Sequence, residues 1–89
     1  MNIEHLIDQL NKYGQRATYG AVGGLVGLPA RSVMHGKPKT IRTSWEVAKK
    51  NWKPSGFDID QQDPRLTLSP APLSTPEALV SWLKSRQIK

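Results

Sequence analysis

Residues 18–36 read TYGAVGGLVGLPARSVMHG and carry the start and stop signals of two short helices. Thr18 has a side chain that caps helix N-termini, and Gly27 is a residue type that ends helices. Apolar residues at helical spacing lie between them. We therefore expect a first helix over about residues 18–26.

A second, shorter helix is expected over about residues 29–35, because Pro29 suits a first helical turn and Gly36 supplies a stop. Helical spacing turns one set of side chains inward and another outward: Ala30, Val33 and Met34 inward, and Arg31, Ser32 and His35 outward. Two helices joined by a tight turn that contains glycine, with exposed polar residues on the second, are typical of a helix-turn-helix.

Gly23 and Gly24 lie in the middle of the first of these helices. A glycine inside a helix costs about 1 kcal/mol relative to alanine. We explain the pair by the close approach of a neighbouring helix, where a Cβ atom would clash.

Two more helices are expected outside this motif. Residues 2–13 place apolar side chains at i, i+3, i+4 and i+7, with Asn2 as a cap and Gly14 as a stop. The last helix, over residues 74–87, opens with the capping-box pattern Ser-Thr-Pro-Glu and puts Trp82 on its apolar face. Both are interpreted as core helices.

The alternating pattern of residues 44–48 predicts a strand, with residues 55–58 as the return strand after a turn. A hairpin that follows a helix-turn-helix is a wing. Trp52 lies near its tip, where it is either a packing residue or a wedge close to a DNA backbone. The fold prediction is therefore a winged helix-turn-helix, mainly α with a small β-hairpin, with residues 1–89 as a single domain.

Residues 58–73 are rich in proline and aspartate, and we expect them to be irregular. Their three aspartates lack the central glycine and final glutamate of a calcium loop, so no metal is expected. The chain has no cysteine and only two histidines, which excludes thiolate chemistry and cysteine-ligated metals. We expect a domain without a cofactor.

The sequence contains no apolar run of about 18 residues, so no membrane span is expected. Its first residues lack the charged-then-apolar layout of a signal peptide, and we therefore expect a cytoplasmic protein.

The formal net charge is +6, and the whole excess lies in residues 31–53, which hold seven bases and one acid. Clustered bases are typical of proteins that bind polyanions, because each contact with a phosphate releases counterions. The alternative is a solvated basic face that only keeps the protein soluble. On the first interpretation, the residues expected to contact DNA in this segment are Arg31, Ser32, His35, Lys37, Lys39, Arg42, Lys49, Lys50 and Lys53.

Two short motifs carry a family resemblance. Thr-Tyr-Gly-Ala-Val occupies residues 18–22 and Pro-Ala-Arg-Ser-Val occupies residues 29–33, and the interval from Val47 to the Gly-Phe pair at 56–57 fits the same pattern. Residues 14–57 thereby resemble the DNA-binding C-terminal domain of O6-alkylguanine-DNA alkyltransferases. The resemblance is closer to the alkyltransferase-like proteins, which lack the acceptor cysteine.

The resemblance implies a winged-helix fold, a helix that enters the minor groove, and a damaged or flipped nucleotide as the target. In that family the arginine of the Ala-Arg pair fills the gap left in the duplex, and the tyrosine after the threonine contacts the neighbouring phosphate. Arg31 and Tyr19 match those positions. A planar guanidinium that stacks on bases suits the first role.

Residues 43–47 occupy the position of the family's active-site motif. Ser44 stands where the acceptor cysteine would be, and Trp45 stands where the helper histidine would be. A serine without an adjacent base is a poor nucleophile at neutral pH, so no catalytic residue is expected. Both remain candidates for lining a base pocket, with Trp45 either stacking on a base or packing in the core.

We therefore expect a non-catalytic protein that binds duplex DNA, in its sharpest form as a sensor of damaged or flipped bases. A small transcriptional regulator is the plainer form of the same hypothesis. The rival from another class is a protein-interaction adaptor on a winged-helix scaffold, with a protein as its partner. The acidic, proline-rich residues 58–73 favour this rival.

Overall fold

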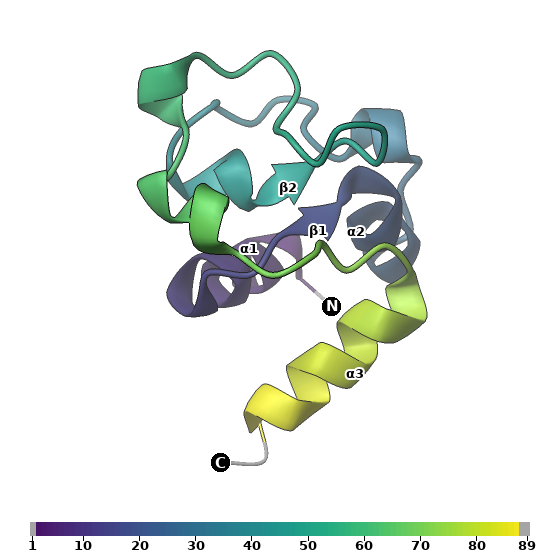
Figure 1. Cartoon of the computed structure of the whole chain (residues 1–89). Coiled ribbons are helices and arrows are strands. Elements are labelled where there is room, and N and C mark those ends of the chain that lie inside the picture. The colour runs from purple at the N-terminus through teal and green to yellow at the C-terminus, as the bar shows by residue number, and fades with distance from the viewer. Residues whose placement is uncertain (1, 88–89) are drawn as a thin grey trace.

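Within residues 2–87, three α-helices and a two-stranded sheet are joined by loops that contain short 3-10 helices (Figure 1). The computed structural model describes residues 2–87. Its main elements follow one another as α1 (Ile3–Tyr13), β1 (Ala17–Thr18), α2 (Tyr19–Val26), β2 (Glu46–Val47) and α3 (Pro76–Gln87). Two short 3-10 helices lie between α2 and β2, and two more lie between β2 and α3. The mainly helical class expected from the sequence is confirmed.

Helix α1 begins and ends where its sequence signals predict. The side chain of Asn2 accepts a hydrogen bond from the backbone N–H of Glu4 at 2.7 Å. Gly14 ends the helix in the left-handed conformation, with φ at 65°. Of the predicted apolar stripe, Leu6, Ile7 and Leu10 are fully buried, and Ile3 is half-buried against the core.

Helix α2 also follows its signals, but the helix expected after it is shorter than predicted. Thr18 Oγ1 accepts from the backbone N–H of Ala21 at 3.1 Å, and Gly27 ends α2 with φ at 80°. The next segment forms only a 3-10 helix, Ala30–Ser32, followed by a turn that ends at Gly36. Too few residues separate the proline from this glycine for a stable α-helix, and 3-10 geometry is common in such short pieces.

The two glycines inside α2 lie where other segments approach it most closely. A Cβ atom on Gly23 would collide with the backbone carbonyl oxygen of Leu28, and one on Gly24 would collide with the ring of Pro76 at the start of α3. The expected close approach of a neighbouring helix is confirmed for Gly24, whereas at Gly23 the approaching segment is the turn that follows α2 and not a helix.

The sheet differs from the hairpin that the sequence predicts. Strands β1 and β2 pair in parallel, with Ala17 opposite Glu46 and Thr18 opposite Val47. Residues 55–58 form a turn and irregular chain, so the prediction of a return strand there is wrong. Gly56, with φ at 75°, turns the backbone out of an extended path. The residues between β1 and β2 form the long crossover that parallel strands require.

A tight loop stands where the tip of the hairpin was expected. The backbone N–H of Trp52 donates to the carbonyl of Ala48 at 2.8 Å, and the N–H of Ala48 donates to the carbonyl of Lys53 at 2.9 Å. This loop, Ala48–Ser55, projects from β2 without strand pairing of its own.

Helix α3 packs against α2 and contributes to the core, as predicted. Its N-terminal cap is Thr75, whose Oγ1 accepts from the N–H of Ala78 at 3.1 Å, rather than the expected Ser-Thr-Pro-Glu box. Trp82 is buried against Tyr13 in an edge-to-face arrangement, with ring centroids 5.9 Å apart. Among residues 2–87, no helix has both the length and the apolar character needed to cross a membrane.

Gly23→Ala should lower the free energy of unfolding by about 1–2 kcal/mol, although alanine is the better helix former. Overpacking against a backbone atom costs about 1–3 kcal/mol, which exceeds the gain in helix propensity of about 1 kcal/mol. Gly20→Ala is the matched control, because the nearest neighbouring atom to a Cβ there lies 4.0 Å away.

Urea unfolding followed by far-UV circular dichroism measures both variants. Gly20→Ala should keep or raise the stability of the wild type. Equal stabilisation by the two substitutions would show that the turn after α2 does not press against Gly23.

Candidate nucleic-acid interface

Tyr19 and Arg31, the two residues that the family resemblance picks out, border the same hollow of about 280 Å³. Tyr19 is the first residue of α2, and Arg31 lies in the 3-10 helix that follows it. The turn after α2 brings them together because it folds back against Gly23. The remaining lining residues are Ala30, Met34 and Ser55.

The phenol of Tyr19 is fixed at the edge of this hollow. Its oxygen accepts a hydrogen bond from the backbone N–H of Ser55 at 2.9 Å. Burial raises the pKa of the Tyr19 phenol above its ordinary value, and the nearby carboxyl of Glu46 adds to the rise. The phenol therefore keeps its proton at neutral pH. That proton is available to donate to an acceptor such as a phosphate oxygen.

The Arg31 side chain is exposed and makes no hydrogen bond or ion pair with any residue from 2 to 87. Its guanidinium is thus free to turn toward a ligand in the hollow. His35 is exposed on the turn that follows, and Ser32 is half-buried beside it. The sequence places all three on the outer side of this segment, and the structure agrees for Arg31 and His35.

A second hollow, of about 590 Å³, adjoins the first and shares Tyr19 and Ala30 with it. Lys49 and Lys50, at the start of loop Ala48–Ser55, line this hollow and are exposed. Arg31 on one side and Lys49 and Lys50 on the other therefore line two hollows that have Tyr19 and Ala30 in common. Lys53, farther along the loop, borders a different hollow.

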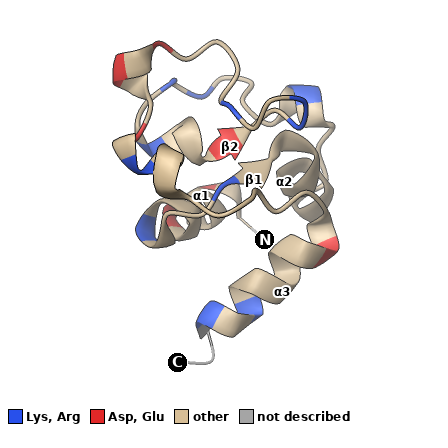
Figure 2. Ribbon diagram, in the orientation of Figure 1, with Lys and Arg blue, Asp and Glu red and all other residues tan. Residues whose placement is uncertain are grey.

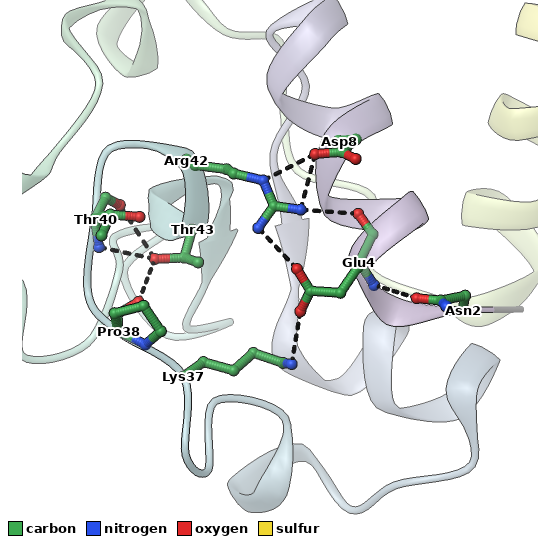
Figure 3. Close-up of polar contacts among 8 residues, drawn as sticks. All are labelled: Asn2, Glu4, Asp8, Lys37, Pro38, Thr40, Arg42 and Thr43. Atoms are coloured by element: carbon green, nitrogen blue, oxygen red, sulfur yellow. Dashed lines mark hydrogen bonds and ion pairs between the residues drawn. The ribbon is translucent and has the colours of Figure 1, made fainter.

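Two cations of the basic segment are instead paired with acids of α1 (Figure 3). Lys37 Nζ lies 2.9 Å from a carboxylate oxygen of Glu4, and Arg42 lies 3.0 Å from Glu4 and 2.8 Å from Asp8. The hydrogen bond from Lys37, followed by that from Arg42, holds the pKa of Glu4 below its ordinary value. Within the fold, these cations fasten the segment before β2 to α1.

The chain between these two cations folds on itself. Thr43 Oγ1 donates to the carbonyl of Pro38 at 3.0 Å and accepts from the N–H of Thr40 at 3.0 Å (Figure 3). Lys39 extends toward Gly56, the residue that follows loop Ala48–Ser55. A Cβ atom on Gly56 would lie 2.9 Å from Nζ of Lys39, so the ammonium group is close to the end of this loop.

The base pocket expected at Ser44 and Trp45 is absent from the described structure, because both residues are fully buried. Ser44 Oγ donates to the carbonyl of Ile41 at 2.6 Å and accepts from the N–H of Asp63 at 3.1 Å. The Trp45 indole donates to the side chain of Asn11 at 2.9 Å and belongs to the hydrophobic core. Trp45 is a core residue, and neither side chain is open to a base.

Glu46 is a buried acid that the sequence analysis assigned no role. Neither of its carboxylate oxygens has a hydrogen-bond partner among the described residues. Desolvation raises the pKa of Glu46 to about 7. The charges of Lys37 and Arg42 lower this pKa, whereas Glu4 raises it. Its position between two buried apolar residues of an expected strand was the only signal in the sequence.

Glu46 makes the stability of the protein depend on pH. Its folded-state pKa lies above the ordinary carboxyl value of 4.5, so the folded protein holds this proton more tightly than the unfolded chain. Stability should therefore fall as the pH rises from about 4.5 through about 7, by a total on the order of 3 kcal/mol.

Denaturant unfolding of the wild type and of Glu46→Gln at pH 5 and pH 8 measures how much stability is lost through ionisation of Glu46. The fall in the free energy of unfolding between the two pH values should be much smaller in Glu46→Gln than in the wild type. Glu77→Gln, which replaces an exposed acid, should show the same fall as the wild type. A wild type that is as stable at pH 8 as at pH 5 would rule out a carboxyl buried without partners.

Comparisons with protein-family models, with curated proteins and with solved structures find no match to this chain. The resemblance to alkyltransferase-like proteins therefore stays a prediction that rests on the motifs of residues 14–57.

Proposed function

We propose that this chain binds duplex DNA without catalysing a reaction. The proposed interface consists of the start of α2, the turn over residues 30–36 and loop Ala48–Ser55. The observation that carries the proposal is that Tyr19 and Arg31, from separate elements, border one hollow. The guanidinium of Arg31 makes no hydrogen bond or ion pair with any residue from 2 to 87. A functional surface of this kind is expected to leave its charged groups without internal partners.

The charge around this hollow supports the proposal. Figure 2 shows basic positions on the turn that follows α2 and on the loop that follows β2, and these two segments border the same depression. Lys49 and Lys50 make no ion pair with any residue from 2 to 87. Phosphates that meet these cations would release counterions, which gives a binding free energy that depends strongly on salt.

The hollow has the groups needed to hold a displaced nucleotide. The Tyr19 hydroxyl, already accepting from Ser55, donates its proton to a backbone phosphate. The guanidinium of Arg31 reaches into the duplex and fills the gap that a displaced base leaves. These are the roles that the family resemblance implies for the two residues.

The absence of catalysis in this proposal rests on the position of Ser44. Its hydroxyl is fully buried and bonds to a backbone carbonyl and a backbone N–H. Among residues 2–87 its proton is donated to a backbone carbonyl and not to a base, and its burial keeps it from a DNA strand.

Arg31→Ala should weaken binding to a duplex with a displaced base more than binding to a fully paired duplex. The reason is that a gap-filling side chain contributes only where a gap exists. Lys84→Ala, in the last turn of α3, removes the same charge outside the proposed interface and should change neither affinity. Fluorescence anisotropy with labelled duplexes measures all three proteins.

Salt dependence gives a second readout of the same experiment. Each lysine that contacts a phosphate should reduce the slope of log K against log salt by about one when it is replaced by alanine. Lys49→Ala and Lys50→Ala should each do so, whereas Lys37→Ala, which removes a cation paired with Glu4, should change the slope less.

Three outcomes would count against the proposal. If Arg31→Ala loses affinity equally for both duplexes, Arg31 is an ordinary phosphate contact and does not fill a gap. A preference for one base sequence, without any for a displaced base, would favour a transcriptional regulator. Failure to bind any duplex at low salt would contradict DNA binding and leave the protein-interaction adaptor.

A further inference from the structure

Loop Ala48–Ser55 holds Trp52 in a conformation that bulky residues rarely adopt. Its φ angle is 59°, and Trp52 has the only positive φ among the non-glycine residues from 2 to 87. The two backbone hydrogen bonds that close the loop, at Ala48, fix this geometry. Strain of this kind persists where surrounding contacts enforce it, and it is concentrated at functional sites.

Arg16 enforces the position of the loop. Its guanidinium donates to the carbonyl of Trp52 at 3.2 Å, and to the carbonyls of Ser69 and Pro70 at 3.1 and 3.0 Å. The guanidinium carbon lies 5.5 Å from the centroid of the Trp52 ring. Arg16 is therefore a positioning residue, which joins the loop to the chain before α3 and supports the indole.

Trp52 differs from the other two tryptophans in being exposed. Its relative exposure is 48%, whereas Trp45 is fully buried and Trp82 is 9% exposed. Because it is held by backbone bonds and by Arg16, its ring is presented in a fixed orientation. An aromatic ring fixed in this way provides a stacking surface at little cost in conformational entropy.

A hollow of about 240 Å³ lies beside this ring. Its lining includes Arg16 and the polar residues Asn51, Lys53, Gln62 and Thr67. The side-chain oxygen of Asn51 accepts from the backbone N–H of Lys53, and its amide N–H groups donate to no residue from 2 to 87. The side-chain nitrogen of Gln62 donates to the carbonyl of Phe57, and its side-chain oxygen accepts from the backbone N–H of Asp58. The hollow thus offers both donors and acceptors beside an aromatic ring, since a carbonyl oxygen that accepts one hydrogen bond can accept a second.

We propose that this hollow binds an unstacked nucleobase, with the base stacked on Trp52 and its edge facing Asn51 and Gln62. A flat ring with donors and acceptors on its edge matches this combination of groups. Lys53 at the rim is placed to meet the adjoining phosphate. The proposal rests on the DNA binding proposed above, since the same loop carries Ser55 into the hollow of Tyr19.

The experiment compares the wild type with Trp52→Leu on three probes. These are a fully paired duplex, a duplex with a one-base bulge and a single-stranded oligonucleotide. Trp52→Leu should weaken binding to the last two by about 5- to 150-fold, the range that stacking of one base supplies. Its affinity for the paired duplex should fall much less, because no unpaired base is available there to stack on residue 52. Trp52→Phe, which keeps an aromatic ring, should retain most of the affinity.

Intrinsic fluorescence gives an independent readout. The unpaired base should quench the tryptophan emission of the wild type, and Trp52→Leu should lose that quenching because its remaining tryptophans are in the core. Ile59→Ala, which removes an exposed apolar residue outside the hollow, is the matched control and should behave as the wild type. Circular dichroism verifies that every variant is folded.

The outcomes separate the two proposals. A loss of affinity by Trp52→Leu that is confined to the bulged duplex, to the single strand, or to both supports stacking. The probe that is affected identifies the source of the base. Stacking is overturned if Trp52→Leu loses affinity equally for all three probes, if it loses none, or if quenching persists in this variant. In each case, binding of the wild type to the paired duplex still supports the proposed function. A wild type that binds none of the probes overturns both.

Discussion

The close contact of three segments at the glycine pair of α2 brings Tyr19 and Arg31 together on the candidate interface. Gly23 allows the turn after α2 to fold back onto the helix, and Gly24 allows α3 to begin against it. The turn carries Arg31 to the side of Tyr19, and α3 closes the core behind them. Two residues that cost helix stability thus provide the geometry of the proposed site, because side chains larger than hydrogen would hold the segments apart.

The basic segment has two physical roles that its charge alone does not distinguish. Lys37 and Arg42 find carboxylates on α1 and hold the chain before β2 in place, and these exposed pairs contribute little stability individually. Arg31, Lys49 and Lys50 have no such partners among the described residues and line two hollows that share Tyr19 and Ala30. The first group organises the surface on which the second group is presented, so the available positive charge is more concentrated than the sequence suggests.

The features that the sequence predicted correctly are local. The caps of α1 and α2 depend on residues a few positions apart. The partner of β2 was predicted wrongly because strand pairing depends on distant chain, here β1 across the whole of α2. For the same reason the sequence left Trp45 open between stacking on a base and packing in the core, which its complete burial decides in favour of the core, and it did not separate paired from unpaired cations. Those distinctions arise from packing against α1 and the segment before α3.

The central claim, that DNA lies against the start of α2, the turn after it and the loop after β2, is tested most directly by mapping the contact surface. Backbone amide resonances of the labelled protein, followed by NMR during titration with a displaced-base duplex, report each segment separately. Shifts should be largest for residues 19–21, 30–36 and 48–55. Shifts centred on α1 or on the last turns of α3, or spread evenly over the chain, would contradict the account.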